Sequence, residues 1–85
     1  MPEISRFYGI IITINYDDHL PPHFHARYGD DRAAIKINGE VLAGSLPRRA
    51  LELVRAWSSL HRVELLKDWD LARAGRDLDA IAPLD

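Results

Sequence analysis

The spacing of apolar residues changes once along the chain, and this change most constrains the fold. Up to about residue 43 apolar and polar residues alternate, as around Ile10, Ile12 and Ile14, which is typical of β-strands. Later apolar residues recur at helical spacing, as in Val54 and Trp57. The segment between them, Ser45-Leu46-Pro47, offers an N-cap residue and an early-turn proline. A strand-rich half followed by a helical half predicts an α+β fold.

We expect a four-stranded, mainly antiparallel sheet with strands at about residues 4–16, 23–28, 33–37 and 40–43. Asn38-Gly39 is the strongest turn signal and predicts a two-residue hairpin between the last two strands. A C-terminal helix over about residues 46–74, long or broken near Ser58-Ser59, packs on one face of the sheet and ends at Gly75. The expected organisation is a single domain, 1–85, with the other sheet face left free.

Composition narrows the classes of function. The chain has no cysteine, so any metal must be held by histidine and carboxylate side chains. A formal net charge of -2 is unlike the basic balance of proteins that bind nucleic acids over a broad surface. No apolar run approaches the roughly 18 residues of a membrane helix, and no secretory signal is recognisable at the start. We therefore expect a cytoplasmic protein without a membrane partner.

The segment Asp17 to His25, D-D-H-L-P-P-H-F-H, is the strongest candidate for a functional site. Strand alternation places His23, His25 and Arg27 on one face of the strand at residues 23–28, and Phe24 on the opposite face, toward the core. If the following loop is residues 29–32, face consistency pairs His25 with Lys36 on the next strand.

One interpretation of this face is metal-free acid–base chemistry. Imidazole titrates near neutral pH, so His23 and His25 can act as general base and general acid. Arg27 and Lys36 would then stabilise the negative charge that develops during cleavage of a phosphodiester such as RNA. This interpretation makes His23, His25, Lys36 and Arg27 the catalytic residues.

Two other interpretations remain open. His19, His23 and His25, with Asp17 or Asp18, form a donor set suited to zinc or another divalent transition metal. Alternatively, these histidines are ordinary surface residues that stabilise a loop by hydrogen bonds. No cofactor is certain from the sequence, and a divalent metal such as zinc is the one that it suggests.

Several segments resemble one small bacterial family. They are I-S-R-F-Y-G-I-I-I, D-H-L-P-P-H-F-H-A-R-Y-G, L-P-R-R-A-L and W-x-x-L-H-R-x-E-L-L-x-D-W-x-L-A-R-x-G, which together cover nearly the whole chain. The family is catalogued as domain of unknown function 4160, and the resemblance implies no established activity. It places His19, His23 and His25 in the family signature, whereas the position of Arg27 often carries an acidic residue there.

The resemblance also implies a genetic setting. Members are often encoded beside another short protein, an arrangement similar to two-gene toxin–antitoxin modules. Together with the histidine face, this predicts a toxin-like component that acts on RNA or another phosphodiester, with a small partner protein encoded by a neighbouring gene. The alternative is a non-enzymatic protein-binding module, with or without a His/Asp metal site.

Overall fold

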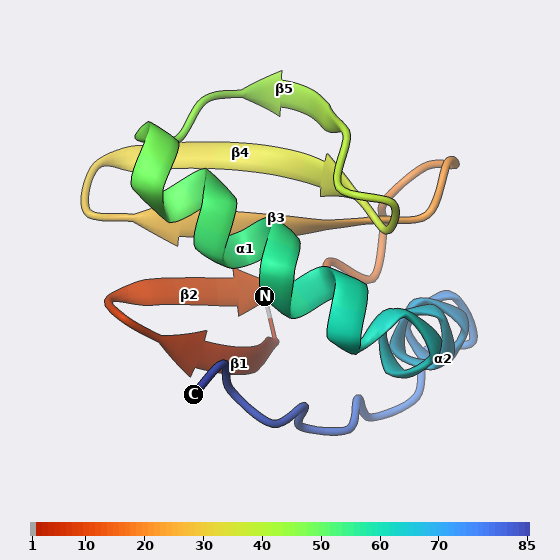
Figure 1. Cartoon of the computed structure of the whole chain (residues 1–85). Coiled ribbons are helices and arrows are strands. Elements are labelled where there is room, and N and C mark those ends of the chain that lie inside the picture. The colour runs from red at the N-terminus through yellow and green to blue at the C-terminus, as the bar shows by residue number, and fades with distance from the viewer. Residues whose placement is uncertain (1) are drawn as a thin grey trace.

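The computed structural model describes residues 2–85, which form five strands followed by two helices (Figure 1). The strands are β1 (Glu3–Phe7), β2 (Ile10–Thr13), β3 (His23–Tyr28), β4 (Asp31–Lys36) and β5 (Val41–Gly44), and the helices are α1 (Arg48–Leu60) and α2 (Arg62–Arg73). All neighbouring strands are antiparallel, in the order β1-β2-β3-β4-β5. The predicted α+β class is confirmed. Neither helix in the described chain is long and apolar enough to span a membrane.

The single strand expected at residues 4–16 is in fact two strands, β1 and β2. Tyr8 and Gly9 form a tight turn between them, with φ angles of 50° and 79°, so that Phe7 pairs with Ile10. Both φ angles are positive, as a type I′ hairpin requires. Residues paired across a two-residue turn share a face, so Phe7 and Ile10 are both buried, whereas an unbroken strand would place them on opposite faces. The sheet consequently has five strands and not four.

The expected pairing of His25 with Lys36 is also wrong. The β3–β4 turn contains two residues, Gly29 and Asp30, so Tyr28 pairs with Asp31 and His23 with Lys36. His25 lies opposite Ala34. A slip of two residues leaves every side chain on its predicted face, which is why face consistency could not detect it.

A hairpin does form at Asn38-Gly39, but its turn is not the expected two-residue one. Lys36 donates its N–H to the Glu40 carbonyl at 2.8 Å, so residues 37–39 form a three-residue loop, in which Gly39 but not Asn38 has a positive φ. Gly39 has a φ of 95° and donates its N–H to the Lys36 carbonyl at 2.8 Å, and the Asn38 side chain accepts a hydrogen bond from the Glu40 N–H. The strand that follows, β5, is an edge strand paired only with β4. Its residues 42–44 are exposed.

Helix α1 lies across one face of the sheet and supplies the centre of the core (Figure 1). Its Trp57 is fully buried and packs against Phe7 and Phe24, with ring centroids 5.3 and 5.8 Å apart. The Trp57 indole donates a hydrogen bond to the Ala82 carbonyl, and Ile81 donates its N–H to Ile4 of β1. The C-terminal segment is therefore fixed against the sheet beside β1.

The helical region is broken at His61, three residues beyond Ser58, the start of the expected break. His61 has φ -121° and ψ 30°, which interrupts the helix between α1 and α2. Helix α2 therefore turns toward the end of the sheet where β3 begins, and is seen almost end-on in Figure 1. It ends at Arg73 with Ala74 as its C-cap residue, and Gly75 adopts the left-handed conformation predicted for a helix terminus, with a φ of 70°.

Candidate metal centre

Asp18, His23 and His25 form a compact group on the sheet face opposite α1. The Asp18 carboxylate oxygen Oδ2 lies 2.9 Å from His25 Nε2 and 3.4 Å from His23 Nε2. One donor atom from each residue lies within 4.8 Å of the other two. Strand β3 supplies both imidazoles at alternate positions, and the loop that connects β2 to β3 folds back to add the carboxylate. The co-facial placement of His23 and His25 thus agrees with the sequence prediction.

The hydrogen bonding of His23 determines which of its nitrogens faces the group. Nδ1 lies 2.8 Å from the Pro21 carbonyl oxygen, which can only accept, so Nδ1 carries a proton. In a neutral imidazole the lone pair is then on Nε2, directed at the Asp18 carboxylate. A lone pair and an anionic oxygen at 3.4 Å repel each other unless a proton or a metal cation lies between them.

His25 has a similar arrangement. Its Nε2 lies 2.9 Å from Asp18 Oδ2 and 3.2 Å from the Asn15 amide nitrogen, which is a donor. A single Nε2 cannot donate to the carboxylate and accept from the amide at the same time. The oxygen of the same amide group, Asn15 Oδ1, is buried and has no hydrogen-bond partner within residues 2–85. A cation between the imidazoles and the carboxylate removes the first conflict, and it removes the second as well when the Asn15 amide is rotated so that its oxygen faces Nε2.

The three side chains differ in exposure, and this difference defines the open side of the site. The side chains of His23 and Asp18 are 10% and 16% exposed, whereas that of His25 is 32% exposed. The two imidazole rings lie edge to face, 5.2 Å apart. Helix α2 closes the buried side with Trp69, whose ring lies 5.3 Å from that of His23. Solvent therefore reaches the group from the side of His25.

The remaining predicted ligands, His19 and Asp17, lie outside this group. Both are exposed and line a shallow depression beside Arg73 of α2. The proline corner separates His19 from the two β3 histidines, and Asp18 takes the position in the group. His61, the fourth histidine of the chain, lies apart from the group: its Nδ1 is 2.7 Å from the Glu64 carboxylate, and its ring is tilted against that of Trp57.

The predicted electrostatic residues lie on either side of the histidines. Lys36 lies opposite His23, and its ammonium group approaches the Glu40 carboxylate at 3.5 Å. Arg27 lies opposite Arg32 and is exposed. Arg27, Arg32 and Arg6 line the same hollow as His25, with a volume of about 400 Å³, within the range typical of ligand sites.

Sequence reasoning missed two residues of this site, Asn15 and Trp69. The alternation of Thr13 and Asn15 on the free face was visible, and it would have placed Asn15 beside the histidines once β2 was paired with β3. Trp69 carried no such signal. A continuous helix would have directed it to the core with Trp57, and only the break at His61 brings it to His23.

Comparison with known proteins identifies the family of this chain. No curated protein and no solved structure showed a significant match. A family model does match, over residues 9–70, which include the β2–β3 loop, both β3 histidines and most of α2. The chain belongs to the family described as "Domain of unknown function (DUF4160)".

Proposed function

We propose that this protein binds a divalent transition-metal ion through Asp18, His23 and His25, and uses it to hydrolyse a phosphodiester bond. The convergence of three donor atoms on one point, with the His23 Nδ1 proton fixed by the Pro21 carbonyl, carries the proposal. Metal-binding histidines commonly donate their second ring N–H to a backbone carbonyl or carboxylate in this way, which directs the other nitrogen to the metal.

The spacing of the donors fits a small tetrahedral ion. Zinc bonds to nitrogen and oxygen at about 2.0 to 2.1 Å, so two ligands of a tetrahedral site lie about 3.3 Å apart. The distances from Asp18 Oδ2 to the two Nε2 atoms, 2.9 and 3.4 Å, are close to this value. Rotation of the Asn15 amide by half a turn brings its oxygen to the position near His25 Nε2, where it can join the donor set.

A site with three protein ligands and a solvent-exposed side is suited to catalysis. The metal would lower the pKa of a bound water and so supply a nucleophile at neutral pH. His25 opens into the hollow that contains Arg27, whose guanidinium can stabilise the charge on a phosphate. Lys36 faces Glu40, so we assign the electrostatic role to Arg27.

The metal-assisted mechanism has stronger support than metal-free acid–base catalysis by His23 and His25. His23 is buried, and its two ring nitrogens face the Pro21 carbonyl and Asp18. A general acid or base must reach the proton that it transfers within hydrogen-bond distance, directly or through one water. His23 has little surface from which to do so, whereas a ligand role needs only the donor atom.

For the substrate and setting, we infer RNA cleavage by a toxin-like component of a two-gene module. The gene arrangement implied by the family resemblance supports this setting. The small partner protein encoded by the neighbouring gene would then restrain the activity.

The second candidate is a protein-binding module, favoured by the uncovered edge of β5. This strand pairs only with β4, and Leu42 is 40% exposed. An extended segment of a partner can add to such an edge as a further strand. Co-purification with the neighbouring gene's product tests this role. Equal retention of the partner by the parent chain and by Leu42→Lys would contradict it.

Titration of the untagged protein with zinc and cobalt tests the metal site. We expect one ion per chain, and at least about a hundredfold weaker metal affinity for His25→Ala. Even the loss of a residue that only hydrogen-bonds to a metal ligand typically lowers metal affinity about 10- to 100-fold. His19→Ala and Asp17→Asn are matched controls, because these neighbours lie outside the group, and they should keep the parent affinity. Equal affinities of His25→Ala and His19→Ala would exclude the site.

Activity is tested on RNA, with growth inhibition as a second readout. Cleavage should stop in excess chelator, return when zinc is restored, and be absent in His25→Ala. Circular dichroism verifies that this variant is folded. Cleavage that persists in chelator, or in His25→Ala, would exclude the metal-dependent mechanism.

A further inference from the structure

Three arginines lie in a single row across the free face of the sheet. Arg6 of β1 pairs with Ile11, Ile11 pairs with Arg27, and Arg27 pairs with Arg32 of β4. Neighbouring strands are about 4.8 Å apart, so the row extends for about 14 Å. All three arginines are exposed and line the hollow that also contains His25. The row was not evident in the sequence, because its members are separated by up to 26 residues and are aligned only by the register.

The positive charge of this row is only partly neutralised. Arg6 forms an ion pair with Glu3 at 2.7 Å, but neither Arg27 nor Arg32 forms an ion pair or a side-chain hydrogen bond within residues 2–85. The acids of the adjoining turn, Asp30 and Asp31, pair with neither. Like charges directly opposite each other on adjacent strands destabilise a sheet. Two unpaired guanidinium groups in this position are therefore complementary to an anion.

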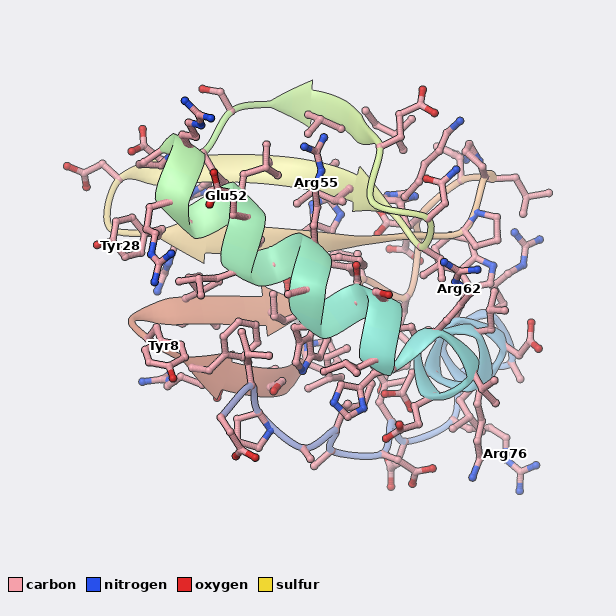
Figure 2. The ribbon with its side chains drawn as sticks, viewed as in Figure 1. Tyr8, Tyr28, Glu52, Arg55, Arg62 and Arg76 are labelled. Atoms are coloured by element: carbon pink, nitrogen blue, oxygen red, sulfur yellow. The ribbon has the colours of Figure 1, made fainter. Side chains whose placement is uncertain are left out.

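Two exposed tyrosines lie at the end of the sheet beyond this row, and neither lines the hollow. Tyr8 and Tyr28 are 57% and 41% exposed, and Figure 2 shows both at the same end of the sheet. A Cβ atom added to Gly9 would lie 3.4 Å from the Tyr28 ring, so this ring packs directly beside the Tyr8-Gly9 turn. Strand alternation places the Tyr28 ring on the sheet face of Phe24 and Ala26, opposite Arg27, so the arginine row must bind its ligand without this ring.

We propose that the arginine row binds the phosphate backbone of a single-stranded nucleic acid and leads it to His25. This inference rests on the proposed function, since it supplies the substrate-binding surface for the metal centre. Arg27 and His25 are two residues apart on β3, so their Cα atoms are about 7 Å apart and their side chains leave the same face of the strand. A small free anion would not need the length of the row.

The test measures fluorescence anisotropy of labelled single-stranded RNA and DNA 12-mers with the full chain in excess chelator, so that no cleavage occurs. Arg27→Gln combined with Arg32→Gln should weaken binding and reduce its salt dependence. Each phosphate contact to a single strand contributes about -0.7 to the slope of log affinity against log salt. Loss of two contacts removes about 1.4, so between 50 and 200 mM salt the parent should lose about sevenfold more affinity than the variant.

Arg48→Gln combined with Arg49→Gln is the matched control, because both arginines are exposed on α1, away from the row. This control should bind as the parent does. Tyr28→Leu should also bind as the parent does, because this ring lies on the opposite face of the sheet from Arg27. Comparison of the RNA and DNA probes identifies which nucleic acid is preferred.

Equal binding by the two double-arginine variants would overturn the inference, as would full competition by inorganic phosphate or by polyglutamate at equal charge. Because binding is measured in chelator, it is independent of the metal site. If the parent chain does not bind zinc but binds nucleic acid through Arg27 and Arg32, the proposed function is contradicted and this inference stands. If the parent chain binds zinc but its nucleic-acid binding does not depend on Arg27 and Arg32, the metal centre stands and the role of the arginine row is excluded.

Discussion

Replacement of Gly44 by alanine tests how β5 is held to the sheet. Gly44 ends β5 with a φ of 75°, a conformation that costs a residue with a side chain about 1 to 2 kcal/mol. A Cβ atom at this position would lie 2.2 Å from the Arg32 carbonyl oxygen and 3.1 Å from the Ala33 Cα. These are backbone atoms that cannot rotate away, so β5 and β4 must separate locally.

The expected loss of stability follows from these contacts. Separation weakens the hydrogen bond from the Ser45 N–H to the Arg32 carbonyl, now 2.9 Å long, which contributes about 1 kcal/mol. With the conformational term, Gly44→Ala should lower the free energy of unfolding by about 2 to 3 kcal/mol or more. For a domain of this size that corresponds to a fall in Tm of roughly 10 to 20 °C.

Gly29→Ala is the matched control. Gly29 also has a positive φ, 59°, but a Cβ atom there would meet nothing within 4 Å. This variant should lose only the conformational term, about 1 to 2 kcal/mol. Urea unfolding of both variants measures the difference. Equal destabilisation of the two would refute the steric reasoning, and a Gly44→Ala variant as stable as the parent would refute the assigned geometry of β5.

Three further outcomes are expected. Asp68 is 1% exposed, and its Oδ1 accepts a hydrogen bond from the Asp79 N–H. Burial raises the pKa of its carboxyl group, so protonation favours the folded state, and the ionised carboxylate lowers stability as pH rises through this pKa. Asp68→Asn keeps the acceptor without the charge and should therefore exceed the parent in free energy of unfolding at pH 7, with a gap that narrows toward acidic pH in urea titrations; a constant gap would contradict this. Trp57→Leu should lower the free energy of unfolding by about 3 kcal/mol and release the C-terminal segment that Trp57 holds at Ala82. Limited proteolysis should then cleave that segment sooner, and an unchanged cleavage rate would contradict this role of Trp57. Zinc at a hundred times its Kd should stabilise the chain by about 2.7 kcal/mol, and chelator should reverse the rise in Tm; a Tm insensitive to zinc would contradict the metal centre.

Much of the fold was predictable because it depends on local chemistry. The alternation around Phe24 identified β3, Asn38-Gly39 identified a hairpin, and Gly75 marked the end of α2. The division of β1 from β2 and the pairing of His23 with Lys36 were not predictable in this way. The two-residue slip of β4 leaves the same side chains on the same face, so burial cannot distinguish the two registers. The β1–β2 turn left only one signal in the sequence, the three-residue spacing of the apolar residues Phe7 and Ile10.

The candidate site was predictable to the same extent. Strand alternation correctly placed His23 and His25 together, because that placement needs only the period of a strand. The choice of Asp18 over Asp17 and His19 depends on the path of the loop through the proline corner, for which the sequence carries no simple periodic signal. Residues aligned by the register, such as Arg6 with Arg27, become neighbours only after the strand pairing is known.

The break at His61 also gives the molecule an internal optical probe. Because α2 turns away from the line of α1, the two tryptophans of the chain lie in different surroundings: Trp57 in the apolar core and Trp69 against the His23 ring. A ligand that changes the charge or position of His23 should change the fluorescence of Trp69, while Trp57 serves as a reference within the same chain. The state of the histidine face can therefore be followed from the emission spectrum, without a label.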